Sequence, residues 1–210
     1  MVLALRRRGL ALPLCRHLHL GLELNHPAAP RRPATYQDVL DAPPNMVAEL
    51  VNGALHLHPR PTSRHARASL KLGARLDDPF DNGVNGPGGW FLAIEPELHL
   101  GDDVPVPDLA GWRRERMGEY PDAPAIELAP DWVCEILSAG TRRFDLTEKR
   151  ARYATAGVAF LWLLDPAAGL LECFALRDGA WVLAGTAQGD EEVRLVPFDA
   201  TGFPLSALWP

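Results

Sequence analysis

The alternation of apolar and polar residues places a β-hairpin near the start of the folded part of the chain. Residues 47–51 and 54–58 are two apolar-rich runs separated by Asn52-Gly53. Asn-Gly between two such runs is the strongest short signal for a two-residue hairpin turn, because both central residues adopt positive φ there. A short helix should precede the hairpin, with Thr35 as its N-cap and Pro43-Pro44 beyond its end.

A longer helix is expected after the hairpin, capped by Thr62 or Ser63 and running to about residue 76. Ala66, Leu70 and Ala74 recur within it at four-residue intervals. Residues four apart lie on the same face of a helix, so this spacing predicts that these three line the buried face, with Leu76 as a further candidate.

The rest of the chain is expected to form strands with one further helix. That helix runs from Phe144 to Ala156 and stops at Gly157, between two strongly apolar runs. Strands are predicted over residues 90–94, 97–100, 104–112, 131–137, 159–164, 170–176 and 181–185. A mixed sheet with helices packed on it buries the apolar faces of such a series, so the predicted fold class is α/β, in the mixed-sheet α+β sense.

Composition separates residues 1–33 from the rest of the chain. Four prolines and no periodic apolar face predict a disordered or loosely packed arm, followed by one domain over residues 34–210. The arm has six arginines and one acid, whereas residues 34–210 have 15 basic and 26 acidic residues. A domain this acidic has no general basic footprint for nucleic acid, but it suits a site that gathers carboxylates around a cation.

Cysteine usage and hydropathy indicate a cytoplasmic protein without a membrane partner. Cys15, Cys134 and Cys173 are widely spaced and form no CxxC pair, which is typical of a reducing compartment. No apolar run approaches the roughly 18 residues that a membrane helix needs. The arginines and apolar residues of 6–15 resemble a signal peptide only in part, because the apolar run breaks at Arg16 without a small-residue cleavage site.

Two predicted strands carry an acid where an apolar residue would be less costly. Asp108 follows Val106-Pro107, and Glu135 lies in the middle of the apolar run 131–137. A buried carboxylate must be neutralised or find a partner, and two carboxylates converging on Mg²⁺ or Mn²⁺ are one solution. Taken singly, each acid has a simpler explanation, as a turn cap for Asp108 and as an arginine partner for Glu135.

Lys149 favours a metal site over these simpler explanations of the two acids. The chain has 19 arginines but only two lysines, Lys71 and Lys149, and the second follows the Glu135 strand. A lysine ammonium is a compact charge that can position water and offset the charge of an attacked phosphate. Without such a role Lys149 is an ordinary solvated residue of a helix.

Further short motifs accompany these residues in a fixed order. They are Tyr36–Leu40, Glu49-Leu50-Val51-Asn52-Gly53, Arg64-His65, Val106–Leu109, Val133–Ser138, Lys149, Tyr153, Gly157-Val158 and Leu161–Pro166. From about Thr35 to Trp209 the chain thereby resembles the Uma-two family of restriction endonucleases, in the PD-(D/E)xK nuclease superfamily. The resemblance implies a restriction-endonuclease-like core with flanking helices and an added antiparallel strand pair. It also implies an Mg²⁺- or Mn²⁺-dependent endonuclease that hydrolyses phosphodiester bonds of nucleic acid, with DNA as the expected substrate.

The resemblance also implies roles for particular residues. Asp108 and Glu135 would be the metal-binding acids, the Ile136 carbonyl a backbone ligand, and Glu49 an early acid near the metal. The superfamily's usual lysine lies two residues after the second acid, where this chain has Leu137.

In this family the amine would come instead from the following helix, which here offers Lys149. Lys149 is therefore the expected catalytic amine, together with the three acids.

Other functions remain open. The same fold could serve as a catalytically inactive binding or assembly module, in line with the acidic domain. His56, His58 and His65 could bind zinc, although an exposed hairpin face is the simpler explanation for the first two. We also expect a symmetric homodimer, because the two late strands leave a sheet edge open to pairing.

Overall fold

A computed structural model describes residues 32–209 of the chain. The contacts separate Pro33–Pro210 from the residues before it, and the helices and strands of the described residues all belong to this second, compact unit. The expectations for the N-terminal arm, for the partial signal-peptide resemblance and for Cys15 fall on residues 1–31, outside the described residues.

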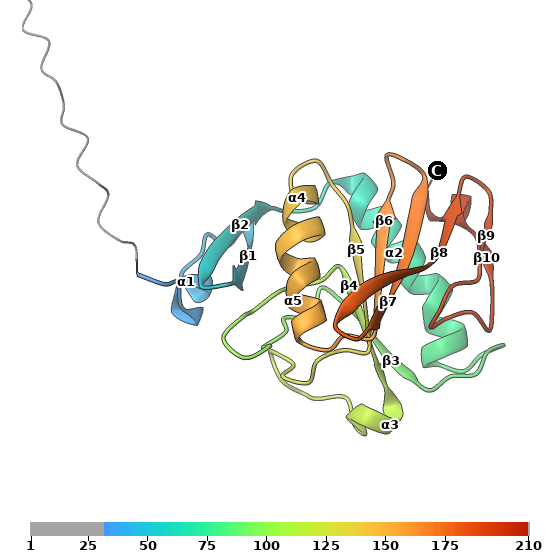
Figure 1. The fold of residues 1–210 in the computed structure, drawn as a ribbon, viewed down its shortest axis with the longest axis horizontal. Helices are drawn as coiled ribbons and strands as arrows, with labels where there is room; N and C mark the ends of the chain where they lie inside the picture. The colour runs from blue at the N-terminus through green and yellow to red at the C-terminus, as the bar shows by residue number, and fades with distance from the viewer. Residues whose placement is uncertain (1–31, 210) are drawn as a thin grey trace, which may run out of the picture. The chain divides into compact units, whose positions relative to one another are not determined.

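A mixed sheet of six strands forms the centre of the second unit (Figure 1). Its order is β3-β4-β5-β6-β7-β8, and its only parallel neighbours are β5 and β6. The strands are β3 (Trp90–Ile94), β4 (Leu109–Arg113), β5 (Trp132–Ile136), β6 (Phe160–Asp165), β7 (Leu170–Arg177) and β8 (Ala180–Gln188). The predicted mixed sheet is confirmed, including the antiparallel strand pair β7 and β8, which meet at Asp178-Gly179.

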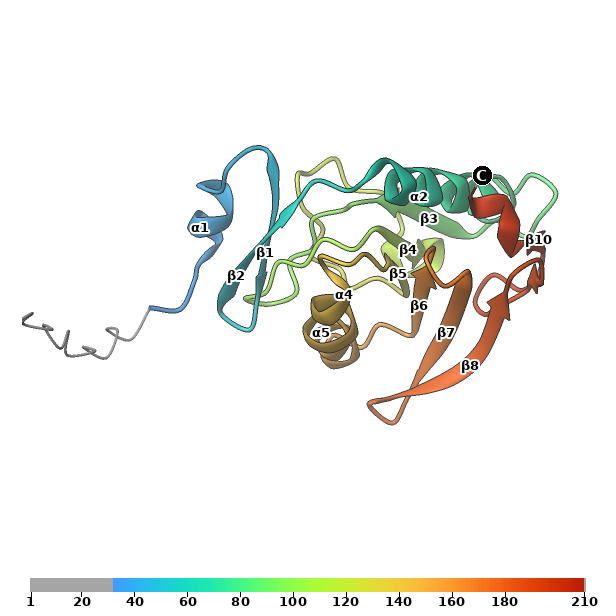
Figure 2. The same ribbon diagram turned by 90° about the horizontal axis from the view of Figure 1, so that it is seen from above.

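Helices cover both faces of this sheet (Figure 2). One face carries α2 (Ser63–Leu76), and the other carries a continuous helical stretch made of α4 (Arg142–Phe144), η2 (Asp145–Lys149) and α5 (Arg150–Thr155). This stretch connects β5 to β6, because parallel neighbours need a crossover connection.

Strand β5 shows how the two faces are separated. Cys134 and Ile136 belong to the same apolar cluster as Leu72 of α2. Val133 belongs instead to the cluster that contains Tyr153 of α5. Since side chains alternate along a strand, the residue between Cys134 and Ile136, a glutamate, is directed to the α5 face.

The hairpin near the start of the unit forms as predicted. β1 (Met46–Val51) pairs antiparallel with β2 (Ala54–Pro59). Asn52 and Gly53 at the turn have φ of 54° and 70°, as this two-residue turn requires. The hairpin is joined to the chain before β4 by an isolated bridge between Leu50 and Val104. The preceding helix α1 (Tyr36–Leu40) begins after Thr35, as predicted.

The predicted buried face of α2 is wrong for Ala66, Leu70 and Ala74, which are exposed, and right for the further candidate Leu76. The buried residues include Ala68, Leu72 and Leu76, whereas Leu70 is 61% exposed. Ala66-Leu70-Ala74 and Ala68-Leu72-Leu76 both repeat every four residues, so spacing alone does not separate them. The second series carries two leucines and therefore buries more apolar area.

The strand predicted over residues 104–112 is shorter than expected. β4 begins at Leu109, because Pro105 and Pro107 have no N–H to donate to a ladder. The segment 97–100 forms only isolated bridges. Elements that were not predicted are η1 (Asp77–Asp81), α3 (Arg114–Met117), β9 (Glu192–Val193), β10 (Phe203–Pro204) and η3 (Leu205–Leu208).

Two further observations concern residues 32–209 as a whole. Cys134 and Cys173 are both buried free thiols. Within this part of the chain, no helix combines the length and the apolar character needed to cross a membrane.

Candidate active site

A pocket of about 210 Å³ opens between the hairpin, the first residue before β4, the end of β5 and the helical stretch after it. Its lining includes all four side chains that the sequence singled out: Glu49, Asp108, Glu135 and Lys149. They come from β1, the residue before β4, β5 and η2, and the antiparallel pairing of β4 with β5 brings the two central acids together.

Asp108 lies where the β4–β5 ladder ends. The last backbone pair joins Leu109 to Cys134. The next β5 N–H group that faces β4 is that of Ile136, and no β4 carbonyl lies opposite it. The Asp108 Oδ2 atom accepts this N–H at 2.6 Å. Its Oδ1 atom lies 2.6 Å from His65 Nε2 at the start of α2. Both oxygens of the carboxylate are thereby fixed in position.

Glu135 is a buried carboxylate on the α5 face of the sheet. Its Oε1 atom accepts a hydrogen bond from the Tyr153 hydroxyl at 2.6 Å and lies 2.9 Å from Lys149 Nζ. Burial raises the pKa of Glu135 well above its usual range, Lys149 opposes this rise, and the nearby Asp145 adds to it. The site therefore holds a carboxyl group that is costly to ionise without a further cation.

Lys149 is buried among these acids. Its Nζ donates to the Val106 carbonyl at 2.9 Å and lies 2.9 Å from Glu135 Oε1 and 3.0 Å from Glu49 Oε1. An ammonium has three N–H donors, so each one has an acceptor. Burial lowers the pKa of Lys149, but Glu135 and Glu49 outweigh this effect and raise it well above its usual value. Lys149 is therefore charged at neutral pH.

Glu49 and Asp145 complete the charged environment of Lys149. Glu49 Oε1 accepts the Val106 N–H at 2.8 Å, which ties the hairpin to the chain before β4. Asp145 Oδ1 lies 4.0 Å from Lys149 Nζ, and burial raises the pKa of Asp145 to about 6. Five carboxylates thus line the pocket, those of these two residues and of Glu95, Asp108 and Glu135, and Lys149 is the buried cation among them.

The helical stretch after β5 directs Lys149 inward by a turn of π-helix. Asp145 and Lys149 are the first and last residues of η2, and both are buried. Such turns are rare in proteins and occur frequently at functional sites. Asp145, Lys149 and Tyr153 follow one another at four-residue intervals, which places them on one side of this stretch.

Ile136 enters the site through its backbone. Its N–H is bound to Asp108, and in a strand the carbonyl of a residue points to the same edge as its N–H. The Ile136 side chain packs on the other face of the sheet, in the cluster with α2.

The hairpin histidines are not on an exposed face, so that expectation is wrong. The side chains of His56 and His58 are 20% and 14% exposed. Both rings pack on Phe144, with centroid distances of 4.2 and 5.1 Å. His65 lines the same pocket as His58 but contacts Asp108, and the three histidines form no metal-binding group. Among the described residues, no three His, Cys, Asp or Glu side chains form a group that could hold a metal by themselves.

Sequence reasoning missed Glu95, which also lines the pocket. Its φ of 48° is unusual for a residue other than glycine, and its N–H donates to the Asp108 carbonyl at 3.1 Å. Nothing in the local sequence marks this position. The roles of Tyr153 and Asp145 as partners of Glu135 and Lys149 were visible only as a four-residue spacing on a helix.

Comparisons with known proteins agree with the fold. The model of the Uma2 family, described as "Putative restriction endonuclease", matches residues 33–206. The chain is also similar to the crystal structure of "a putative nuclease belonging to DUF820" from Anabaena variabilis, with a TM-score of 0.66 and 21% sequence identity. That similarity covers 84% of this chain and 97% of the other. No curated protein matches the chain. The predicted restriction-endonuclease-like core is thereby confirmed.

Proposed function

Because the chain belongs to the Uma2 family of restriction endonucleases, we propose that it is a divalent-metal-dependent nuclease acting on nucleic acid, with DNA as the expected substrate. The observation that carries this proposal is the geometry of Asp108 and Glu135. Asp108 directly precedes β4, Glu135 lies in the neighbouring strand β5, and both line one pocket together with a buried, charged lysine. The reaction is hydrolysis, in which a water oxygen bonds to the phosphorus and one ester oxygen leaves.

The charge of the pocket supports a bound cation. The pocket lining has five carboxylates against Lys149 and Arg60, and carboxylates held close together repel one another unless further positive charge is added. Asp108, Glu135 and the Ile136 carbonyl would hold Mg²⁺ or Mn²⁺. Two carboxylates suffice, since Mg²⁺ completes its shell with water and phosphate oxygens. When bound, the ion polarises the phosphate and makes a water molecule more acidic.

The chain's own residues fix the groups around the substrate. Tyr153 and Lys149 orient the Glu135 carboxylate, and His65 with the Ile136 N–H orients that of Asp108. Lys149 keeps its proton and supplies positive charge beside the attacked phosphate. Glu49 holds Lys149 in place from the hairpin side.

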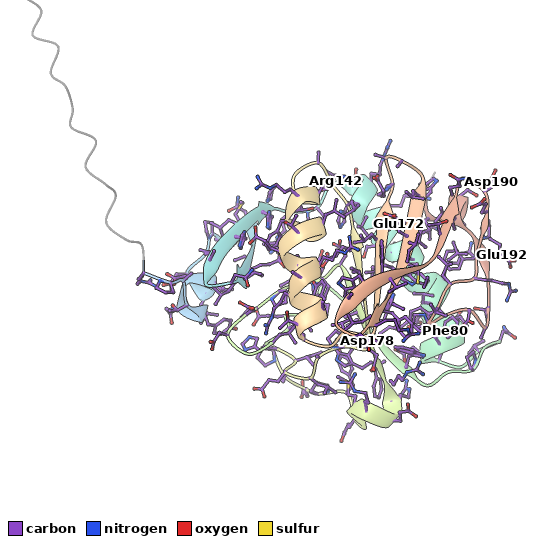
Figure 3. All side chains as sticks on the ribbon, in the orientation of Figure 1. Phe80, Arg142, Glu172, Asp178, Asp190 and Glu192 are labelled. Carbon is purple, nitrogen blue, oxygen red and sulfur yellow. The ribbon has the colours of Figure 1, made fainter. Side chains whose placement is uncertain are left out.

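The test is a cleavage assay on duplex and single-stranded DNA and on RNA, with Mg²⁺ or Mn²⁺. Asp108→Ala and Glu135→Gln should each abolish cleavage, and calorimetric titration with Mn²⁺ should show weakened binding in both. Asp190→Asn is the matched control, because Asp190 lies between β8 and β9 and does not line the pocket. The pocket instead lies beside α4, which Arg142 marks in Figure 3. A wild-type protein that cleaves no nucleic acid with either ion would contradict the proposal and favour the catalytically inactive binding module.

We further propose that the protein is a symmetric homodimer. β8 is an edge strand of the six-stranded sheet, and it carries Val182 and Leu183, which are 51% and 53% exposed. An edge strand presents unpaired N–H and C=O groups, and exposed apolar residues beside them favour pairing with another copy.

A further inference from the structure

One face of α2 carries a concentration of positive charge that the rest of the unit lacks. Residues 50–76 contain five basic residues and no acidic one, whereas the remaining residues of 34–210 contain ten basic and 26 acidic residues. The five are Arg60, Arg64, Arg67, Lys71 and Arg75.

Four of these residues form a continuous stripe along the helix. Arg64, Arg67, Lys71 and Arg75 are separated by three, four and four residues, and at about 100° per residue they fall within an arc of roughly 80°. At about 1.5 Å per residue the stripe is roughly 16 Å long, with one cation for every 5 to 6 Å or so. We call these four residues the basic stripe of α2.

The basic stripe is not neutralised by the protein. Three of its members are exposed and Lys71 is half-buried. No acidic side chain within residues 32–209 forms an ion pair with any of the four. Five of the ten other arginines in residues 34–210 do have acidic partners, in the pairs Arg114–Asp81, Arg116–Asp131, Arg142–Asp165, Arg152–Asp103 and Arg194–Glu192.

The basic stripe starts at the wall of the pocket. Arg60, Thr62 and His65 line the pocket, and Arg64 directly precedes the histidine that contacts Asp108. From there the stripe runs along α2 away from the site. If one phosphate of a nucleic-acid strand lies in the pocket, the neighbouring phosphates outside the pocket would therefore lie along this row of cations.

We propose that the basic stripe of α2 binds the phosphate backbone of the strand whose scissile phosphate lies in the pocket, an inference that rests on the proposed nuclease function. The net negative charge of residues 34–210 repels a polyanion from the remaining surface. Phosphate contacts give affinity without reading sequence, so the stripe sets how the strand lies and leaves base selection to other contacts.

The salt dependence of binding tests this assignment. Fluorescence anisotropy of a labelled DNA duplex and of its single strand is measured in EDTA, which prevents cleavage, between about 50 and 200 mM salt. The stripe variant is Arg64→Gln/Arg67→Gln. The control, Arg177→Gln/Arg194→Gln, loses the same charge from β7 and from the segment after β9. Circular dichroism checks that α2 remains helical in the stripe variant.

The stripe variant should bind more weakly, and its plot of log affinity against log salt should be shallower by about 1.8 for the duplex and about 1.4 for the single strand. The control should keep the wild-type slope. Equal slopes for stripe variant and control, or no binding of either DNA by the wild type, would overturn the assignment. If the wild type cleaves DNA but the stripe variant keeps the wild-type slope, the nuclease function is supported and the role of the stripe is rejected. If the stripe variant has a shallower slope but the wild type cleaves no nucleic acid, phosphate binding by the stripe is supported and the nuclease function is rejected.

Discussion

At the scale of single residues, Lys149 compensates the negative charge of the buried carboxylates around it. Breaking a buried ion pair by removing one partner costs about 3–5 kcal/mol, because the other charge stays buried without compensation. Lys149→Met should therefore lower the free energy of unfolding by about that amount, since it leaves Glu49 and Glu135 without their cation. Lys71→Met removes the chain's other lysine from the surface of α2 and should change stability little.

The loss caused by Lys149→Met should depend on pH in a defined direction. The pKa of Glu135 is already raised in the folded protein and should rise further without the lysine. A carboxyl group whose pKa is higher in the folded than in the unfolded state stabilises the fold while protonated and loses that contribution as pH rises. Urea unfolding should thus show a larger penalty at pH 8 than at pH 5. A penalty that is equal at both values would argue against uncompensated carboxylates as its cause.

Asp145 offers a second test of the same electrostatics. Burial raises its pKa to about 6, against an ordinary value of 3.8. The free energy of unfolding should therefore fall by about 3 kcal/mol as pH rises from about 4 to beyond 6, because ionising Asp145 is harder in the folded state. Asp145→Asn should match wild type near pH 4 and be more stable at pH 8, as measured by thermal unfolding. Asp165→Asn is the opposite control, because hydrogen bonds from Arg142 and from the Ala168 and Ala167 N–H groups lower the pKa of Asp165 despite its burial.

At the scale of elements, the amine of the site comes from a helix rather than a strand. Leu137 lies two residues after Glu135 and packs in the same apolar cluster as Tyr153. Lys149→Ala should reduce the cleavage rate by about 10²- to 10⁴-fold, the usual cost of a positioned catalytic group. Adding Leu137→Lys should recover part of this loss, because the amine then enters from the strand on the same face. Recovery should be incomplete, since lysine at a buried position is poorly solvated.

A matched control for this exchange lies on the same strand. Val133→Lys in the Lys149→Ala background places an amine on the same face as Glu135, but two residues away on the other side. It should recover nothing. Cleavage assays of the wild type and the three variants, with circular dichroism to verify folding, test this exchange. Full activity in Lys149→Ala alone would remove this lysine from the mechanism.

The elements that could be predicted are those with a local signal. The Asn52-Gly53 turn and the apolar strand around Glu135 were found because positive φ and apolar runs restrict which residues can occupy them. The π-helical turn over Asp145–Lys149 has no residue signature of its own, since it depends on how the helix packs. Asp108 and Glu135 could be paired from sequence, but the position of Glu95 beside Asp108 depends on a long-range pairing of β3 with β4.

At the scale of the whole molecule, charge is separated between the pocket and the surface of α2. The pocket gathers carboxylates that suit a cation, whereas the basic stripe of α2 carries unpaired positive charge next to it. The overall acidity of residues 34–210, which by itself argues against nucleic-acid binding, is thus compatible with a strand approaching from one direction. Net charge alone could not predict this, because it averages over faces that only the fold separates.

The proposed homodimer is also a property of the whole molecule. β3 and β8 are the two edges of the sheet, and β8 exposes Val182 and Leu183 beside its free backbone groups. Leu183→Lys should convert the dimer to a monomer, because a lysine on an edge strand opposes pairing with a second copy. Leu70→Lys alters an equally exposed leucine on α2 and should leave the dimer intact. Light scattering at high micromolar concentration measures both, and a wild-type monomer mass there would exclude the dimer.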